Sequence, residues 1–259
     1  MATGNDFIII DNRSSALKGL SALARKLCDR KWGVGGDGML VIERSKKADF
    51  RMRIFNSDGS EAEMCGNGSR CVALYAAKHG LAAGNMAIET VAGILKASVK
   101  GDTVKVMLTE PRDIRWNFCL MIHKCPYKLS FMNTGVPHVV HFVEDLESVD
   151  VRNIGSHLRR HGEFAPEGTN ADFVKVAGRN RIRVRTYERG VEDETLACGT
   201  GSVASALIAA EAERMSSPVT VETRGGEKLK VYFDKSGGDF SNVYLEGSAK
   251  IVFEGKITV

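Results

Sequence analysis

The chain has 259 residues, of which 36 are basic and 32 acidic, and its formal net charge is +4. A charge this small and dispersed does not indicate a nucleic-acid partner or an anionic membrane surface. No stretch approaches the roughly 18 apolar residues of a membrane span, so we expect a cytoplasmic protein without a membrane partner.

The cysteines exclude two classes of small-domain stabilisation. They are Cys28, Cys65, Cys71, Cys119, Cys125 and Cys198, and no two form a CxxC pair. Neither a zinc ribbon nor a dense disulfide framework is therefore indicated, and free thiols fit a reducing compartment. The segment from Cys119 to Cys125 contains His123 but matches no common metal motif. We expect these two cysteines, like Cys28 and Cys71, to be buried structural residues.

The first half of the chain predicts an alternation of strands and helices. We expect strands at 7–11, 39–43 and 50–55, helices at 17–29 and after residue 65, and a hairpin or meander over 86–110. The glycine-rich turn WGVGGDG at 32–38 lacks the lysine of a P-loop and opens a strand, which excludes a nucleotide site there. The segment Glu110-Pro111-Arg112 is the predicted boundary between the halves, because proline interrupts the strand pattern.

The second half repeats this plan. A strand is expected at 139–142, a polar helix at 147–161, a turn and strand at 167–176 and a further strand from residue 181. In that last strand Arg181, Arg183 and Arg185 alternate with less polar residues. This pattern indicates a half-buried strand with a solvated basic face, in preference to a nucleic-acid stripe.

A thirteen-residue stretch occurs twice. Residues 65–77 read CGNGSRCVALYAA and residues 198–210 read CGTGSVASALIAA, with eight of thirteen positions identical at an offset of 198 minus 65, or 133. Each cysteine precedes a Gly-x-Gly turn that opens an apolar run, a pattern typical of a loop leading into a buried helix. A thiol at the positive end of a helix is expected to have a lowered pKa. Two such thiols on pseudo-symmetric halves suggest a shared ligand.

Several segments together carry a resemblance to a known family. They are GNDFIIID, FNSDGSEAEMCGNGSRC, NTGVPHVV, PEGTNADFV, YERGVEDETLACGTG and VFEG, in this order along almost the whole chain. The sequence resembles diaminopimelate epimerases, which interconvert LL- and meso-2,6-diaminopimelate in lysine and peptidoglycan-precursor synthesis. The resemblance implies an α/β fold of two pseudo-symmetric domains, each a curved mixed β-sheet around a central helix, with the active site between them. The implied domains are 1–112 together with 248–259, and 113–247, and a homodimer is also implied.

The resemblance also implies the site. Cys65 and Cys198 would be the acid/base pair, one thiol and one thiolate, acting without pyridoxal phosphate, another cofactor or a metal. His138 and Glu188 would tune the two thiols. The substrate-binding residues implied are Asn5, Asn56, Gly66, Asn67, Asn170, Glu188, Arg189, Gly199 and Thr200, with Arg189 on a carboxylate and Glu188 on an ammonium group. Taken singly, each asparagine reads as a turn residue and His138 as a core histidine.

The chemistry required gives the cysteine pair an independent rationale. Inverting an α-carbon means removing a proton from one face and delivering one to the other, which two opposed acid/base groups achieve. Backbone N–H groups at two helix starts, at Gly66, Asn67, Gly199 and Thr200, could hold the substrate carboxylate.

Some positions depart from the family pattern, and two other functions stay open. Val136 stands where many members have an asparagine and Gly38 where some have glutamine, and little sequence precedes GNDF. A trimmed start would affect the pairing of the first strand more than the chemistry. A proline or hydroxyproline racemase would also use paired cysteines, but its small substrate leaves Arg189, Glu188 and three asparagines without a role. A non-enzymatic amino-acid-binding protein would not need opposed thiols.

Overall fold

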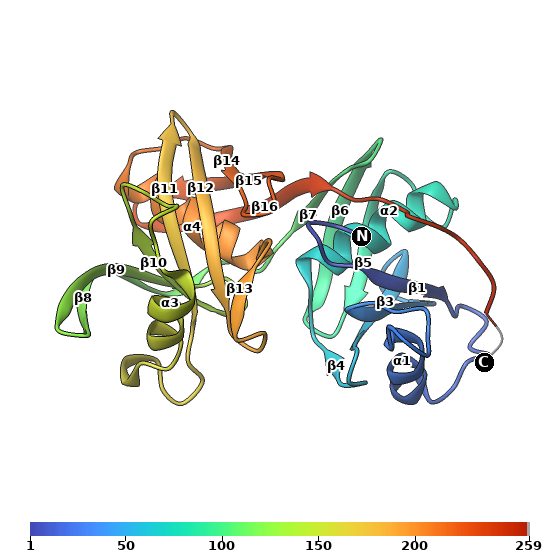
Figure 1. Ribbon diagram of the computed structural model, residues 1–259. Coiled ribbons are helices and arrows are strands. Elements are labelled where there is room, and N and C mark those ends of the chain that lie inside the picture. Colours follow the sequence, from blue (N-terminus) through green and yellow to red (C-terminus); the bar gives the residue numbers. More distant parts are fainter. Residues whose placement is uncertain (258–259) are drawn as a thin grey trace. The chain divides into compact units, whose positions relative to one another are not determined.

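The computed structural model, which describes residues 1–257, contains two compact units (Figure 1). The first comprises Met1–Met107 and the segment that begins at Gly247, and the second comprises Leu108–Glu246. The units thus divide at 107 and 247, close to the boundaries of 112 and 248 expected from the sequence. Residues 258 and 259 of the predicted first domain lie outside the described residues.

The first unit is a mixed sheet with two helices. Its elements are β1 (Phe7–Asp11), α1 (Leu20–Cys28), β2 (Gly38–Glu43), β3 (Phe50–Asn56), β4 (Glu61–Ala62), α2 (Gly66–Lys78), β5 (Asn85–Thr90), β6 (Gly93–Lys100) and β7 (Thr103–Met107). The strand order is β1-β2-β3-β5-β6-β7, with β4 paired to β3. The pairs β1–β2 and β3–β5 are parallel, and the others are antiparallel.

The second unit contains the same kinds of element and one extra hairpin. Its elements are β8 (Arg112–Ile122), β9 (Cys125–Asn133), β10 (Pro137–Phe142), α3 (Val151–Arg159), the 3-10 turn η1 (Gly162–Phe164), β11 (Asn170–Gly178), β12 (Arg181–Glu188), β13 (Asp193–Thr195), α4 (Gly199–Ala212), β14 (Val219–Glu222), β15 (Lys228–Ser236) and β16 (Asp239–Ser248). The strand order is β8-β9-β10-β11-β12-β14-β15-β16, with β13 paired to β12.

The pairing scheme of the first unit recurs in the second. The parallel pairs are β10–β11 and β12–β14, in the places of β1–β2 and β3–β5, and β13 lies on β12 as β4 lies on β3. The hairpin β8–β9 is an addition at one edge. The predicted mixed α/β fold is therefore confirmed, and the repeated sequence motif belongs to a repeated topology.

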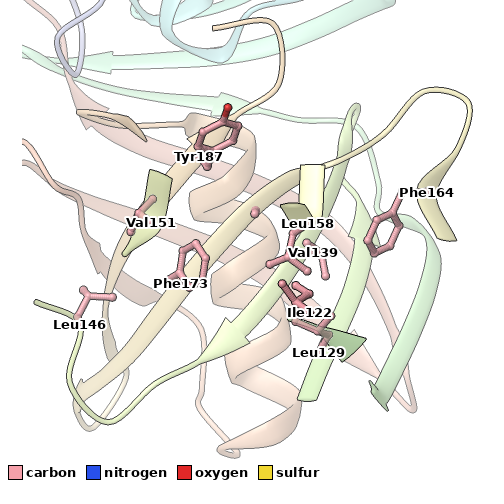
Figure 2. Packing of buried hydrophobic residues seen from close by; sticks show 10 residues of the cluster. Ile122, Leu129, Val139, Leu146, Val151, Leu158, Phe164, Phe173 and Tyr187 are labelled. Carbon is pink, nitrogen blue, oxygen red and sulfur yellow. The ribbon is translucent and has the colours of Figure 1, made fainter. Parts of the chain in front are cut away.

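Each unit has a central helix on one face of its sheet and a second helix on the other. In the second unit α4 contacts strands from β9 to β15, while α3 lies against β11 and β12 (Figure 1). Most of α4 is buried, since its sequence GTGSVASALIAAEA carries no polar stripe. Successive side chains of β11 therefore point alternately toward α3 and toward α4. Phe173 packs in the α3 cluster of Figure 2, whereas Asp172 faces the start of α4.

The first unit is layered in the same way. Its central helix α2 is buried along most of its length, and α1 covers the opposite face of the sheet. The cluster under α1 contains Leu20, Ala24, Leu27, Cys28, Met39, Val41 and Phe55. Between Met39 and Val41, Leu40 faces α2 at Gly68, so β2 is buried on both sides.

Two of the predicted buried cysteines are exposed. Cys119 and Cys125 lie on the two strands of the β8–β9 hairpin, which turns at His123 and Lys124, both with positive φ. Because β8 is an edge strand, the expectation of buried structural residues is wrong for this pair. Cys28 and Cys71 are buried as predicted.

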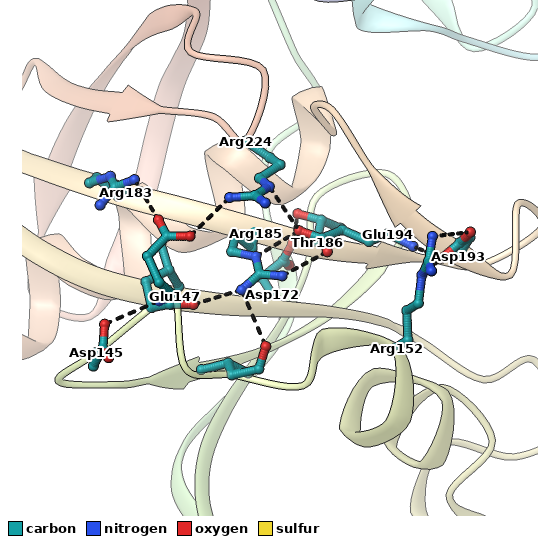
Figure 3. A network of polar contacts seen from close by, with 12 residues as sticks. Asp145, Glu147, Arg152, Asp172, Arg183, Arg185, Thr186, Asp193, Glu194 and Arg224 are labelled. Carbon is teal, nitrogen blue, oxygen red and sulfur yellow. Dashed lines mark hydrogen bonds and ion pairs between the residues drawn. The ribbon is translucent and has the colours of Figure 1, made fainter.

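The basic face of β12 is not simply solvated. Arg185 is buried and forms two hydrogen bonds with Glu194 of β13, at 2.7 and 2.8 Å (Figure 3). Arg183 bonds Glu147 at 2.9 Å, and Glu147 also bonds Arg224 at 3.0 Å. The prediction of a solvated face is therefore wrong for Arg185, whose ion pair with Glu194 ties β12 to the strand that precedes Cys198, whereas Arg183 is half-exposed.

None of the helices within residues 1–257 is long and apolar enough to cross a membrane.

A glycine on α3 provides a test of how this helix packs against β12. A Cβ at Gly155 would lie 2.4 Å from the Cβ of Tyr187, a close approach that only glycine permits. Alanine usually stabilises a helix by about 1 kcal/mol relative to glycine. Here we expect Gly155→Ala to lower the free energy of unfolding by about 1–3 kcal/mol, because α3 must move off β12. Urea unfolding measures this, and Gly162→Ala, with nothing within 4 Å, is the matched control. Equal stability of the two variants would contradict the packing.

Candidate functional site

Each repeated cysteine caps the N-terminus of its central helix. Cys65 and Cys198 have extended backbones, with φ of −146° and −119°, and α2 and α4 begin at the next residue. The first helical hydrogen bonds run from Ser69 N to Cys65 O at 2.8 Å and from Ser202 N to Cys198 O at 2.9 Å. The predicted loop-to-helix setting is thus confirmed for both. The first N–H groups of each helix have no acceptor within the helix.

In the first unit an unbroken series of hydrogen bonds starts beneath Cys65. The guanidinium of Arg70 donates to Asn67 Oδ1 at 2.6 Å, Asn67 Nδ2 donates to Asn5 Oδ1 at 2.8 Å, and Asn5 Nδ2 donates to Asp37 Oδ2 at 2.7 Å. A guanidinium only donates and a carboxylate only accepts. The two ends therefore fix the direction of both amides between them.

Arg70 was not among the residues expected from the sequence. It is fully buried, and it also donates to Thr3 Oγ1 at 2.8 Å and to the carbonyl of Ser248 at 3.2 Å. It thereby connects the N-terminal segment, α2 and the segment that returns from the second unit. The available signal was a charged residue in the middle of a helix whose other charge, Lys78, lies at its end.

In the second unit the side chain bonded to the residue two positions after the cysteine is an imidazole, where the first unit has the amide of Asn5. His138 is fully buried, its Nδ1 lies 2.7 Å from Asp172 Oδ2, and its Nε2 lies 2.9 Å from Thr200 Oγ1. Thr200 Oγ1 is in turn 3.5 Å from Cys198 Sγ. The other carboxylate oxygen of Asp172 accepts from Thr186 Oγ1 at 2.6 Å. His138 is thus linked to the second cysteine through a hydroxyl.

Asp172 was also not among the residues expected from the sequence. Comparison of the two units shows that the carboxylate is a feature of the second unit. The second glycine of each cysteine motif lies over a side chain of the sheet: Gly68 over Leu40, and Gly201 over Asp172. A leucine therefore stands in one unit where the other has a carboxylate. Burying a carboxylate is costly unless its oxygens are bonded, and both oxygens of Asp172 are. The signal available in the sequence was an acidic residue on the inward face of a strand that is buried on both sides.

Three further predicted residues make contacts within the protein. Asn170 is buried, with Nδ2 donating to Pro137 O at 2.9 Å and Oδ1 accepting from Arg189 N at 2.8 Å. The Arg189 side chain reaches the carbonyl of Glu167 at 3.2 Å. Asn56 donates to Ser60 Oγ at 2.9 Å within its own turn. Asn170 thus sets the backbone position of Arg189, and Asn56 behaves as a turn residue here.

One departure from the family pattern has a physical reason. A Cβ at Gly38 would lie 2.7 Å from the carbonyl oxygen of Phe55 on the neighbouring strand. No side chain fits this place without a backbone shift. Val136 offers only a carbonyl contact, which accepts from Thr134 N at 3.1 Å.

Comparison with known proteins places this geometry in a family. The family model described as Diaminopimelate epimerase matches residues 1–114 and 130–252. The Diaminopimelate epimerase of Aquifex aeolicus (strain VF5) is 44% identical over 269 residues, covering 99% of this chain and 95% of the relative. The chain belongs to the diaminopimelate epimerase family. Its members are isomerases in lysine biosynthesis, and the predicted diaminopimelate epimerase function and isomerase class are confirmed.

Two more distant structures share the fold. A Bacillus anthracis phenazine biosynthesis protein of the PhzF family superposes with a TM-score of 0.76 at 19% identity, over 99% of this chain and 94% of that one. A probable proline racemase from Agrobacterium radiobacter K84 superposes with a TM-score of 0.63 at 15% identity, over 90% and 81%. At these identities the likeness concerns the fold alone. It does not favour the proline racemase alternative over the diaminopimelate epimerase family.

Burial has the largest effect on the pKa of Cys198. Burial raises the pKa of the Cys198 thiol well above its ordinary value, and the carboxylates of Glu188 and Asp172 raise it further. The expectation of a lowered pKa at the helix start is therefore wrong for Cys198, because desolvation of the thiolate outweighs the helix dipole. Burial also raises the pKa of Glu188, and nearby Asp172 adds to the effect.

No cluster of three or more His, Cys, Asp or Glu side chains able to hold a metal occurs within residues 1–257.

The two motif glycines give a matched test of the site. A Cβ at Gly201 would lie 2.5 Å from Asp172 Oδ1 and 3.1 Å from His138 Cε1. A Cβ at Gly68 would lie 3.1 Å from a methyl group of Leu40 and 3.5 Å, an ordinary contact distance, from Cys65 Cβ. We expect Gly201→Ala to lower kcat/KM toward diaminopimelate on the order of 100-fold, since a shift of about 1 Å in a catalytic group has this effect. Gly68→Ala should lose much less, and a larger loss in Gly68→Ala would contradict the site as described.

Proposed function

We propose that this diaminopimelate epimerase inverts its substrate with two thiols, Cys65 and Cys198, which act on opposite faces of one α-carbon. The observation that carries the proposal is the equivalence of the two residues. Each is the N-cap of the central helix of a unit, in a fold whose strand pairing is repeated. A duplicated frame supplies two similar acid/base groups, which is what inversion requires.

The proposed step needs one thiolate and one thiol. The thiolate takes the α-proton, while the thiol on the other side delivers its own proton to the same carbon, so the two residues exchange roles between reaction directions. Because the pair is coupled, its titration belongs to both residues. Helix-start N–H groups at Gly66, Asn67, Gly199 and Thr200 support the proposal as donors for the substrate carboxylate and its developing enolate charge.

Substrate recognition is proposed for the polar residues around each cysteine. Arg189 would bind a carboxylate of diaminopimelate, and Glu188 would accept from an ammonium group. Two observations support this assignment. The Arg189 backbone is held by buried Asn170, and the amides of Asn5 and Asn67 have fixed directions. Asn56 is included as a ligand that would exchange its bond with Ser60 for one with substrate.

Other expectations stay predictions. We propose that the protein is a cytoplasmic homodimer, that it uses no cofactor or metal, and that it has no nucleic-acid partner. The mild net charge of +4 supports the last of these.

The two-thiol mechanism predicts the source of the new proton. In D₂O, early turnover should place deuterium at the α-carbon of the product while unreacted substrate stays protiated, because the delivering thiol has exchanged with solvent. Cys65→Ala and Cys198→Ala should each abolish inversion, since the remaining thiol reaches only one face. Mass spectrometry of both diaminopimelate isomers measures the label. Product that keeps its original hydrogen, or substantial turnover by either variant, would contradict the assignment.

Arg189 gives a separate test of substrate binding. Removing one partner of a desolvated charged hydrogen bond costs about 2–5 kcal/mol, so Arg189→Ala should lose a corresponding share of kcat/KM. The protein should remain folded, because the backbone bond from Arg189 N to Asn170 is kept and the side chain bonds the Glu167 carbonyl at 3.2 Å and lies 4.0 Å from its carboxylate. Glu167→Ala is the matched control and should retain activity, since the carbonyl remains. Unchanged kcat/KM in Arg189→Ala would remove Arg189 from the site.

A further inference from the structure

Asp172, His138, Thr200 and Cys198 form one connected series, and all four lie in the second unit. Asp172 and His138 are buried and sit on adjacent strands, β11 and β10, while Cys198 and Thr200 lie at the start of α4. Glu188 at the end of β12 is the other titratable group whose charge acts on this cluster. Neither Asp172 nor the order of these contacts is part of the family resemblance described above.

The hydrogen-bond chemistry sets a direction for the series. A carboxylate accepts only, so Nδ1 of His138 must carry the proton that faces Asp172. In the neutral imidazole Nε2 is then an acceptor, and Thr200 Oγ1 donates to it. The hydroxyl oxygen of Thr200 keeps lone pairs with which to accept from the Cys198 thiol. Every group thus has a definite role before any proton moves.

We propose that Asp172 is a positioning residue that holds His138 in the Nδ1–H form, so that His138 can take the proton of Cys198 through Thr200. In this transfer the S–H bond of Cys198 breaks as a new O–H bond forms on Thr200. At the same time the original O–H bond of Thr200 breaks and an N–H bond forms at Nε2 of His138. A thiol and a neutral imidazole become a thiolate and an imidazolium, and total charge is unchanged.

Asp172 contributes twice to this transfer. Its carboxylate selects the tautomer that leaves Nε2 open, and its negative charge stabilises the imidazolium formed, as an aspartate does behind the histidine of a serine-hydrolase triad. The cluster also explains how a buried thiol could ionise at all. Burial raises the pKa of Cys198, so loss of its proton to bulk water is unfavourable, whereas transfer within the cluster keeps the charges paired.

The side chains described around the first cysteine loop are different. There the residue two positions after the cysteine is Asn67, its partner is Asn5, and Leu40 stands beneath the motif glycine in the place of Asp172. Amides do not take up a proton near neutral pH. The repeat therefore supplies an internal comparison in which the cysteine at the helix start is retained and the side chains around it differ.

The decisive variant is Asp172→Asn, because two explanations of Asp172 predict opposite signs. As a nearby negative charge alone, Asp172 disfavours the Cys198 thiolate, so its neutralisation would lower the midpoint of Cys198 ionisation. As the proposed positioning residue, its replacement removes the charge that stabilises the His138 imidazolium, so the Cys198 thiolate loses its cationic partner. The midpoint should then rise by about one pH unit or more, which corresponds to a tenfold or larger loss of thiolate.

The measurement is the ultraviolet absorbance of the thiolate as a function of pH, without diaminopimelate. Subtracting the titration of a matched Cys198→Ser protein isolates Cys198 in each background. Ser202→Ala is the control, because Ser202 Oγ donates to the Cys198 carbonyl at 2.8 Å and this variant loses a buried bond at the same loop without touching the series. A midpoint that falls or stays in Asp172→Asn, or that rises equally in Ser202→Ala, would overturn the proposal.

A second measurement needs no variant and covers the case in which Asp172→Asn does not fold. Nitrogen-15 shifts of the wild-type histidines report which ring nitrogen of His138 carries a proton. A neutral ring with its proton on Nδ1, or a doubly protonated ring beside a Cys198 thiolate, supports the proposal. A neutral ring with its proton on Nε2, or a doubly protonated ring beside a protonated Cys198, refutes it.

This inference rests on the proposed acid/base role of Cys198, and turnover separates the two. If both are right, Asp172→Asn lowers kcat with KM nearly unchanged, since Asp172 contacts no substrate. A raised midpoint with normal kcat would support the proton route and exclude Cys198 as an acid/base group. A lowered kcat with an unchanged midpoint would overturn the route while leaving the two-thiol mechanism standing.

Discussion

The structure depends on enclosing a helix of small residues at the centre of each sheet. A helix such as α4 can be surrounded on all sides only because its side chains are small and apolar. Water is then excluded from its neighbourhood, and any polar group at its start must find its partner within the protein. Arg70 in the first unit and Asp172 in the second are buried charges of this kind, and each binds the side chains that surround a cysteine loop.

The two units share a backbone plan but differ in what they can do with a proton. Asn67 and Thr200 occupy the same place after their cysteines, and each bonds a side chain in or just before a strand that pairs in parallel with its neighbour. In the first unit the bond joins two amides, fixed by a cation at one end and a carboxylate at the other. In the second it joins a hydroxyl and an imidazole. Duplication thus conserves position, and substitution within it makes the two cysteines chemically different.

Local patterns in the sequence predicted the parts of the fold that depend on local chemistry. Strand-like segments next to turns located β1 and β3, and the Gly-x-Gly turns located the starts of α2 and α4. The predicted site residues did not include Arg70 or Asp172, because their contacts join separate segments of the chain, 67 residues apart for Arg70 and Thr3 and 34 for Asp172 and His138. For the same reason the ion pairs of Arg185 and the exposure of Cys119 were not predicted: both depend on which strand lies alongside or at the edge.

The raised pKa of Cys198 is compatible with a catalytic thiol. As the pKa of a thiol rises, the fraction present as thiolate falls, but the thiolate becomes a stronger base. A thiolate strongly stabilised by a helix dipole would be plentiful but weakly basic, and an α-hydrogen of an amino acid is a very weak acid. A desolvated thiolate is scarce but a stronger base. Burial of Cys198 therefore favours the proton-transfer step itself, provided that the protein supplies an acceptor through which the thiolate can form. The buried imidazole two hydrogen bonds away is such an acceptor, and this explains why a sheet position that is apolar in one unit carries a carboxylate in the other.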